Sequence, residues 1–187
     1  MKRPFGRIEP GQRVLRKESG QAIAELAIVL IPLLLLILAI LQFGFIYNAQ
    51  IGLTNAVRDT ARYGSTLVAN DAATATTAAD RGFTFLTTSL GTYVAPYSSS
   101  RLVTGAGASR VCYVQHDDGN SSDDPVWVSV TASYRHPLLV PLVGSIIDLF
   151  DGAADDSFMI SATTEIRVDN PSTPVPAVAS PGPCDFL

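Results

Sequence analysis

The stretch that decides the fold is LAIVLIPLLLLILAILQFGFIY, which runs from Leu26 to Tyr47. It contains no charged residue, and only Pro32, Gln42 and Gly44 interrupt its apolar run. As a helix rising about 1.5 Å per residue it extends roughly 33 Å, enough to cross a hydrocarbon core of about 30 Å. Because backbone amides in lipid must be satisfied internally, a helix is the expected conformation. The chain is therefore predicted to be a single-pass membrane protein.

Charge divides the chain at the same segment. Residues 1–17 carry a net charge of +5 and the remainder carries −9, which gives −4 overall. The positive-inside bias holds a basic segment before an apolar run in the cytoplasm. The N-terminus is therefore expected to be cytoplasmic, the C-terminal domain extracytoplasmic, and the location the cell membrane. The acidic body argues against nucleic acid as a partner, since phosphate binding needs a cationic face.

A cleaved secretory signal is the alternative interpretation of the apolar segment. Such a signal has an apolar region of about 7–15 residues that ends in a small-x-small cleavage site. Here the run is longer, and it ends in Phe45-Ile46-Tyr47-Asn48, which is bulky where small residues are needed. Retention of the segment as a membrane anchor is therefore favoured.

The junction before the membrane helix contains an unexpected carboxylate. Glu25 lies at the mouth of the apolar run, where a charge is costly unless it is paired or reaches the interface. As a first-turn acid at the interface it would be stabilised by the helix dipole. Alternatively, cleavage after Gly20 would make Gln21 the N-terminus, with its ammonium one helical turn from Glu25 on the same face. That pair could form within one subunit or between neighbouring subunits.

These residues resemble a known processing site and a known family. A glycine, four residues and a glutamate between a basic leader and a membrane helix are similar to the cleavage site of type IV pilin-like proteins. The longer pattern resembles the TadE-like family, which are minor pseudopilin-like proteins of tight-adherence (Flp) pilus systems. It is carried by SGQAIAELAIVLIPL at 19–33, QFG at 42–44 and LTNAVRDTARYG at 53–64.

The resemblance implies a function and a set of partners. A prepilin peptidase would cut between Gly20 and Gln21, Glu25 would be the fifth residue of the mature chain, and the protein would take part in assembly or display of the pilus. Its partners would be the peptidase, the lipid bilayer and other pilus subunits packed on the N-terminal helix. Gln42, a hydrogen-bonding side chain within the span, is a candidate contact with a partner helix. The alternative is an unprocessed, membrane-tethered extracytoplasmic domain that binds a ligand or an ion.

Beyond the anchor, the sequence predicts an α+β class: a membrane helix extended into a stalk, then a small exported domain with an antiparallel sheet and short helices. Helical spacing continues to Tyr63, with Gly64 as a C-terminal stop. Residues 69–79 are expected to be a linker or frayed helix and 81–90 a short helix. Alternation predicts strands at 111–114, 126–132 and 158–168, with an apolar turn or crossover at 136–150. The predicted parts are a basic leader (1–20), the transmembrane helix and stalk (21–64), the exported domain (65–169) and a Pro-rich tail (170–187).

The remaining chemistry is sparse. Cys112 and Cys184 both fall on the expected exported side, where a disulfide persists, so a bridge is favoured over two free thiols. The acidic clusters at 116–124 and 148–156 are interpreted as turns rather than calcium sites, because the spacing does not fit an EF-hand loop. No nucleophile motif, phosphate loop or CxxC is present, so no catalytic site, metal or cofactor is predicted, and the protein is not expected to be an enzyme. An exported hydrolase would need a convergent pocket that the sequence does not reveal.

Overall fold

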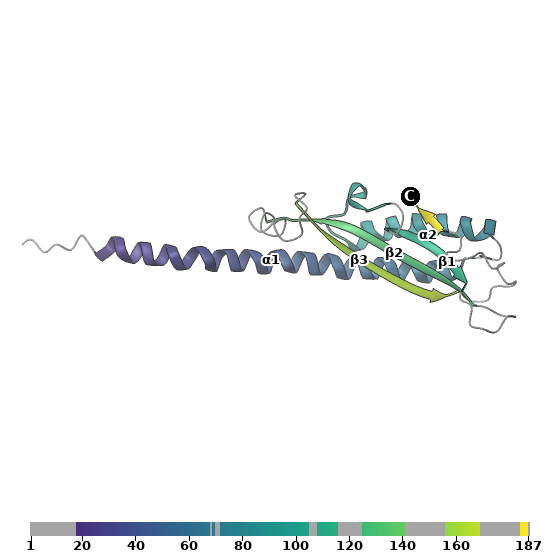
Figure 1. The fold of residues 1–187 in the computed structure, drawn as a ribbon, viewed down its shortest axis with the longest axis horizontal. Coiled ribbons are helices and arrows are strands. Elements are labelled where there is room, and N and C mark those ends of the chain that lie inside the picture. The colour runs from purple at the N-terminus through teal and green to yellow at the C-terminus, as the bar shows by residue number, and fades with distance from the viewer. Residues whose placement is uncertain are drawn as a thin grey trace, which may run out of the picture.

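The computed structural model describes residues 18–67, 69, 72–104, 108–115, 125–140, 156–168 and 184–186. In chain order, the elements are α1 (Glu18–Ser65), α2 (Ala72–Tyr93), η1 (Ser99–Arg101), β1 (Arg110–Gln115), β2 (Val126–Pro137), β3 (Ser157–Arg167) and β4 (Cys184–Phe186). The predicted α+β class is confirmed: a long N-terminal helix leads into a small domain built on an antiparallel sheet (Figure 1).

The first helix has two parts, one that projects from the domain and one that packs against the sheet. α1 is continuous over 48 residues, including Pro32, and therefore extends about 72 Å. Its N-terminal part projects beyond the domain, whereas its C-terminal part lies along the sheet (Figure 1). The buried apolar residues of the C-terminal part recur at helical spacing and are Ile46, Ala49, Leu53, Ala56, Val57 and Ala61. The predicted continuation of the membrane helix into a stalk is confirmed, and the helix ends at Ser65, one residue after Gly64.

The second helix differs from its prediction. The linker interpretation of residues 72–79 is wrong, because these residues and the predicted short helix form the single helix α2. Alanine is the best helix former, and Ala75, Ala78 and Ala79 lie buried in the domain core. Their small side chains allow α2 to pack closely in the core. At the other end of the helix pair, Gly52 of α1 also allows a close approach.

At Gly52, the two helices approach too closely for a side chain. A Cβ atom there would overlap the backbone carbonyl oxygen of Tyr93, the last residue of α2. Nearby, the Tyr93 hydroxyl donates a hydrogen bond of 2.7 Å to the Asp59 carboxylate. The hydrogen bond and the negative charge of that carboxylate raise the pKa of Tyr93. The helix pair is thus joined both by close backbone packing and by a polar contact.

The sheet has the order β3-β2-β1-β4 with antiparallel neighbours. β2 is longer than predicted: it runs to Pro137, and its pairing with β3 extends from Trp127 opposite Arg167 to Pro137 opposite Ser157. α1 packs on β2 and β3, and α2 packs on β1 and β4. The core therefore lies between the helix pair and the sheet.

Several predicted features lie outside the described residues. These are the basic leader up to residue 17, the turn at 116–124, the acids Asp148, Asp151 and Asp155, the crossover from residue 141 to 150, and the Pro-rich tail up to residue 183. Within the region predicted as tail, β4 pairs with β1, a strand that the sequence analysis did not predict.

Candidate functional site on the N-terminal helix

The predicted processing residues lie together at the start of α1. Gly20, Gln21 and Glu25 are exposed, and no atom outside the local helix lies within 4 Å of where a Gly20 Cβ would be. The Gln21 side-chain amide donates a hydrogen bond of 3.0 Å to the Glu25 Oε1 atom. This contact places residues 21 and 25 on one face of the helix, as their spacing predicts.

The helix that follows has the surface of a membrane span. Its apolar window has a mean hydropathy of 3.0, and only 6% of that window is buried. The core helix of a water-soluble domain of this length would bury its apolar side chains, whereas here residues such as Ile28 and Tyr47 are 72% and 69% exposed. By length and composition this helix can cross a bilayer. The fold therefore combines one helix that is long and apolar enough to span a membrane with a small α+β domain at one end of it.

Gln42 makes a different contact from the predicted one. It is fully buried, and its Oε1 atom accepts hydrogen bonds of 3.0 Å from the backbone N–H groups of Leu139 and Val140. The chain's own segment occupies this oxygen, and the predicted contact with a partner helix stays a prediction. Within the described part of the chain, the Nε2 atom of Gln42 has no hydrogen-bond partner. The sequence held no signal for this contact, since Leu139 lies 97 positions further along the chain.

The two cysteines lie on adjacent strands. Cys112 is buried in β1 and disulfide-bonded. The register of β1 and β4 sets Cys112 directly opposite Cys184, the other cysteine of the chain. This register supports the predicted bridge, which would tie β4 to β1 near the C-terminus.

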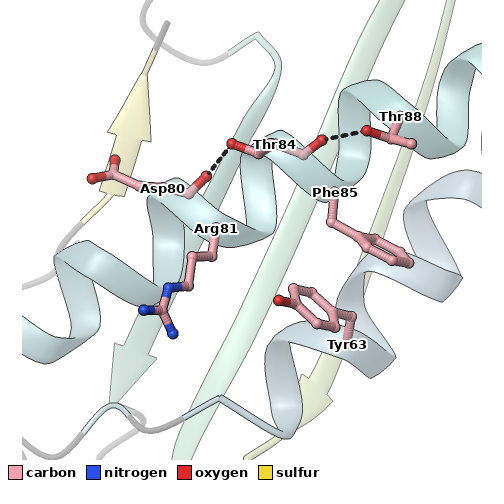
Figure 2. A pocket seen from close by; sticks show the side chains of 6 residues that line it. All are labelled: Tyr63, Asp80, Arg81, Thr84, Phe85 and Thr88. Atoms are coloured by element: carbon pink, nitrogen blue, oxygen red, sulfur yellow. Dashed lines mark hydrogen bonds between the residues drawn. The ribbon is translucent and has the colours of Figure 1, made fainter.

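A surface hollow of about 370 Å³ lies between the C-terminal end of α1 and the middle of α2, away from the projecting helix. Figure 2 shows the stacked rings of Tyr63 and Phe85, whose centroids are 4.5 Å apart. The hydroxyls of Thr84 and Thr88 donate to the carbonyl oxygens of Asp80 and Thr84 in their own helix. Their protons are therefore already used within α2, and the hollow has no nucleophile beside a base.

Titratable groups are scattered in the described ranges. No group of three or more His, Cys, Asp or Glu residues there could hold a metal ion. His136, near the end of β2, is fully buried. Burial lowers its pKa, and the positive charge of Arg101 lowers it further, while the backbone near Ala95 and Pro137 acts in the opposite direction. The prediction that the chain is not an enzyme stays a prediction.

Comparison with known proteins identifies the N-terminal region. The family model described as TadE-like protein matches residues 20–62. The match begins at Gly20 and ends inside α1, so it covers the processing residues, the apolar helix and the stalk. It confirms, over this region of the chain, the TadE-like resemblance predicted from the sequence. No curated protein and no solved structure matches the chain.

Proposed function

We propose that this chain is a minor pseudopilin-like subunit that takes part in assembly or display of a tight-adherence (Flp-type) pilus. The observation that carries the proposal is the arrangement of Gln21 and Glu25 on one exposed face at the head of an apolar helix. The TadE-like match over the same residues supports it. Partners in this proposal are the prepilin peptidase, other pilus subunits and the lipid bilayer.

The proposed mechanism is helix packing after cleavage. A cut between Gly20 and Gln21 would create an ammonium one turn from the Glu25 carboxylate, within one subunit or between neighbours. The projecting part of α1 exposes large apolar side chains on all sides. Lipid covers them in the membrane, and helices of other subunits would cover them in an assembly. The basic leader would lie in the cytoplasm and the domain outside the cell membrane.

Cleavage is tested by the N-terminal sequence of the mature protein. We expect wild type to begin at Gln21 and Gly20→Leu to stay uncut, because a branched side chain replaces the hydrogen that a protease subsite must accommodate. Gly44→Leu is the matched control, since Gly44 also has open space around it and lies far from the cut. The control should be processed normally.

Two outcomes would contradict the proposal. Cutting of Gly20→Leu after residue 20 would exclude the prepilin-peptidase interpretation while leaving the membrane anchor intact. An intact leader in functional wild-type protein would instead favour the alternative, a membrane-tethered extracytoplasmic domain that binds a ligand or an ion.

A further inference from the structure

The domain is attached to α1 at a level inside the apolar segment. Gln42 precedes Tyr47, the end of that segment, by about 7.5 Å along the helix axis. Its Oε1 atom holds the backbone of Leu139 and Val140 at 3.0 Å. The end of the β2–β3 hairpin therefore reaches down beside the helix, toward its projecting part (Figure 1). If α1 spans a bilayer, this end of the domain lies below the membrane surface.

The side chains at this level are apolar and exposed. Leu139 is 47% exposed and Met159 is 63% exposed, and on α1 the Phe43 side chain is 60% exposed. We call Leu139, Phe158 and Met159 the foot of the domain. Between the foot and α1 lies an apolar groove of about 520 Å³, lined by Phe43, Gly44, Ile46, Tyr47, Gln50, Phe158 and Ile160. An exposed apolar groove of this kind marks an interaction site.

At this level the Gln42 oxygen satisfies two backbone N–H groups, whereas its own Nε2 amide has no partner among the described residues. In a bilayer, a backbone N–H group or a side-chain amide without a partner is costly. The Gln42 oxygen accepts hydrogen bonds from two backbone N–H groups. Leu139 and Val140 therefore bring fewer unpaired donors into the membrane. Because Gln42 lies within the predicted span, this pairing explains a polar residue there without a partner helix.

Two charged residues limit how deep the foot can go. Arg135 is paired in register with Met159, and the backbone carbonyl of the exposed Asp156 accepts a hydrogen bond from the Leu138 N–H group. Long basic side chains extend from an apolar position to lipid headgroups. The foot therefore fits the boundary between headgroups and acyl chains, which interfacial segments enter by about 5–10 Å.

We propose that the foot is a second membrane contact of this protein, in which lipid acyl chains cover Leu139 and Met159 and enter the apolar groove. The occupant is lipid because the groove is continuous with the exposed apolar face of α1 at Phe43 and Tyr47. Met159 points to the other face of the sheet, where it is exposed at the same end of β3. The domain would then rest in the surface of the leaflet on its own side. This inference rests on α1 spanning a membrane and is independent of cleavage and of the pilus function.

The proposal is tested with the full chain in phosphatidylcholine vesicles. Single substitutions Met159→Cys, Thr163→Cys and Arg167→Cys place an environment-sensitive fluorophore at three exposed positions of β3. The last two lie about 13 Å and about 26 Å from Met159 along the strand. The unsubstituted protein is the labelling control. We expect nitroxide lipids to quench the label several-fold more strongly at Met159 than at Arg167, with Thr163 between them.

Two outcomes would contradict the proposal that the foot contacts lipid. One is equal, water-like emission at all three positions. The other is a label at Met159 that is shielded from water but not quenched by lipid, and that loses its shielding at one protein per vesicle. The second result would assign this face to another copy of the chain.

Gln42 offers a second test with a matched control. We expect Gln42→Leu to release Leu139 and to lower lipid quenching several-fold at Leu139→Cys. Thr54→Val removes a hydroxyl from the same helix that donates to the Gln50 carbonyl at 2.8 Å and does not line the groove, and it should leave that quenching in place. Wild-type quenching in Gln42→Leu would contradict the role given to Gln42 in holding the foot.

Discussion

Glu25 combines a charge with an apolar setting, and the two properties can be separated by substitution. We expect Glu25→Val to insert normally, because the helix becomes more apolar, but to assemble poorly with pilus components. Glu25→Gln, which keeps an acceptor but not the charge, should also assemble poorly if an ammonium is the partner. Membrane fractionation and co-purification measure the two effects. Wild-type assembly of Glu25→Val would reduce Glu25 to an interfacial acid.

His136 predicts a pH dependence of stability. Burial lowers its pKa, so the unfolded chain binds a proton below about pH 6.5 that the folded chain does not bind. The free energy of unfolding should therefore fall as the pH falls from 7.5 toward 5. Thermal unfolding in detergent measures this slope, and His136→Phe should flatten it.

The other histidine provides the control for that experiment. His116→Gln should keep the wild-type slope, because the effect is assigned to His136. An unchanged slope in His136→Phe would show that other groups cause the pH dependence.

At single residues, the sequence predicted local relations better than distant ones. The pairing of Gln21 with Glu25 follows from a four-residue spacing on one helix, and the structure contains it. Gln42 was singled out as a polar residue in an apolar run, yet its partners came from another part of the chain. Long-range contacts depend on how the elements pack, which residue spacing does not encode.

Among the elements, the α1–α2 contact predicts a steric effect at Gly52. Gly52→Ala would push a Cβ atom into the Tyr93 carbonyl, so we expect thermal unfolding to show a loss of about 1–3 kcal/mol. Gly44→Ala is the control: its Cβ meets nothing within 4 Å, and alanine favours helix by about 1 kcal/mol. Equal stability of the two variants would mean that the helices separate without cost.

The strand pair β1–β4 predicts the behaviour of the thiols. If Cys112 and Cys184 are bridged, the folded oxidised protein should resist alkylation until it is reduced. A bridge closing a loop of about 70 residues would contribute roughly 4 kcal/mol in the chain-entropy model. As a control, Cys112→Ser should leave Cys184 open to labelling. Labelling of both thiols in the oxidised wild type would exclude the bridge.

Element prediction succeeded where one face of a segment is apolar throughout. Alternation located β2 and β3, and the apolar run located α1. The sequence pattern did not predict that α2 is continuous, because alanine and threonine differ little in hydrophobicity. It also did not predict β4, which follows a Pro-rich segment. β2 was predicted too short because the strand was ended at residue 132, before Tyr134, and His136 was assigned to the following turn, although both residues continue its buried face.

At the scale of the whole molecule, the charge distribution predicts the orientation of the chain in the membrane. The basic leader should keep an N-terminal tag in the cytoplasm, and protease added outside intact cells should digest only the region after Gly64. Immunoblotting of both ends before and after lysis measures this, with lysed cells as the control. Digestion of the N-terminal tag in intact cells would overturn the charge argument.

The unbroken helix also makes the protein a lever. α1 passes from the projecting part into the domain core without a hinge, so the angle of the helix to the membrane sets the angle of the domain. Transmembrane helices tilt by about 20° on average, and over the roughly 27 Å of α1 beyond Tyr47 such a tilt displaces its far end by about 9 Å. Force applied at the start of α1 would likewise reach the packed core directly, since the helix is continuous from Glu18 to Ser65.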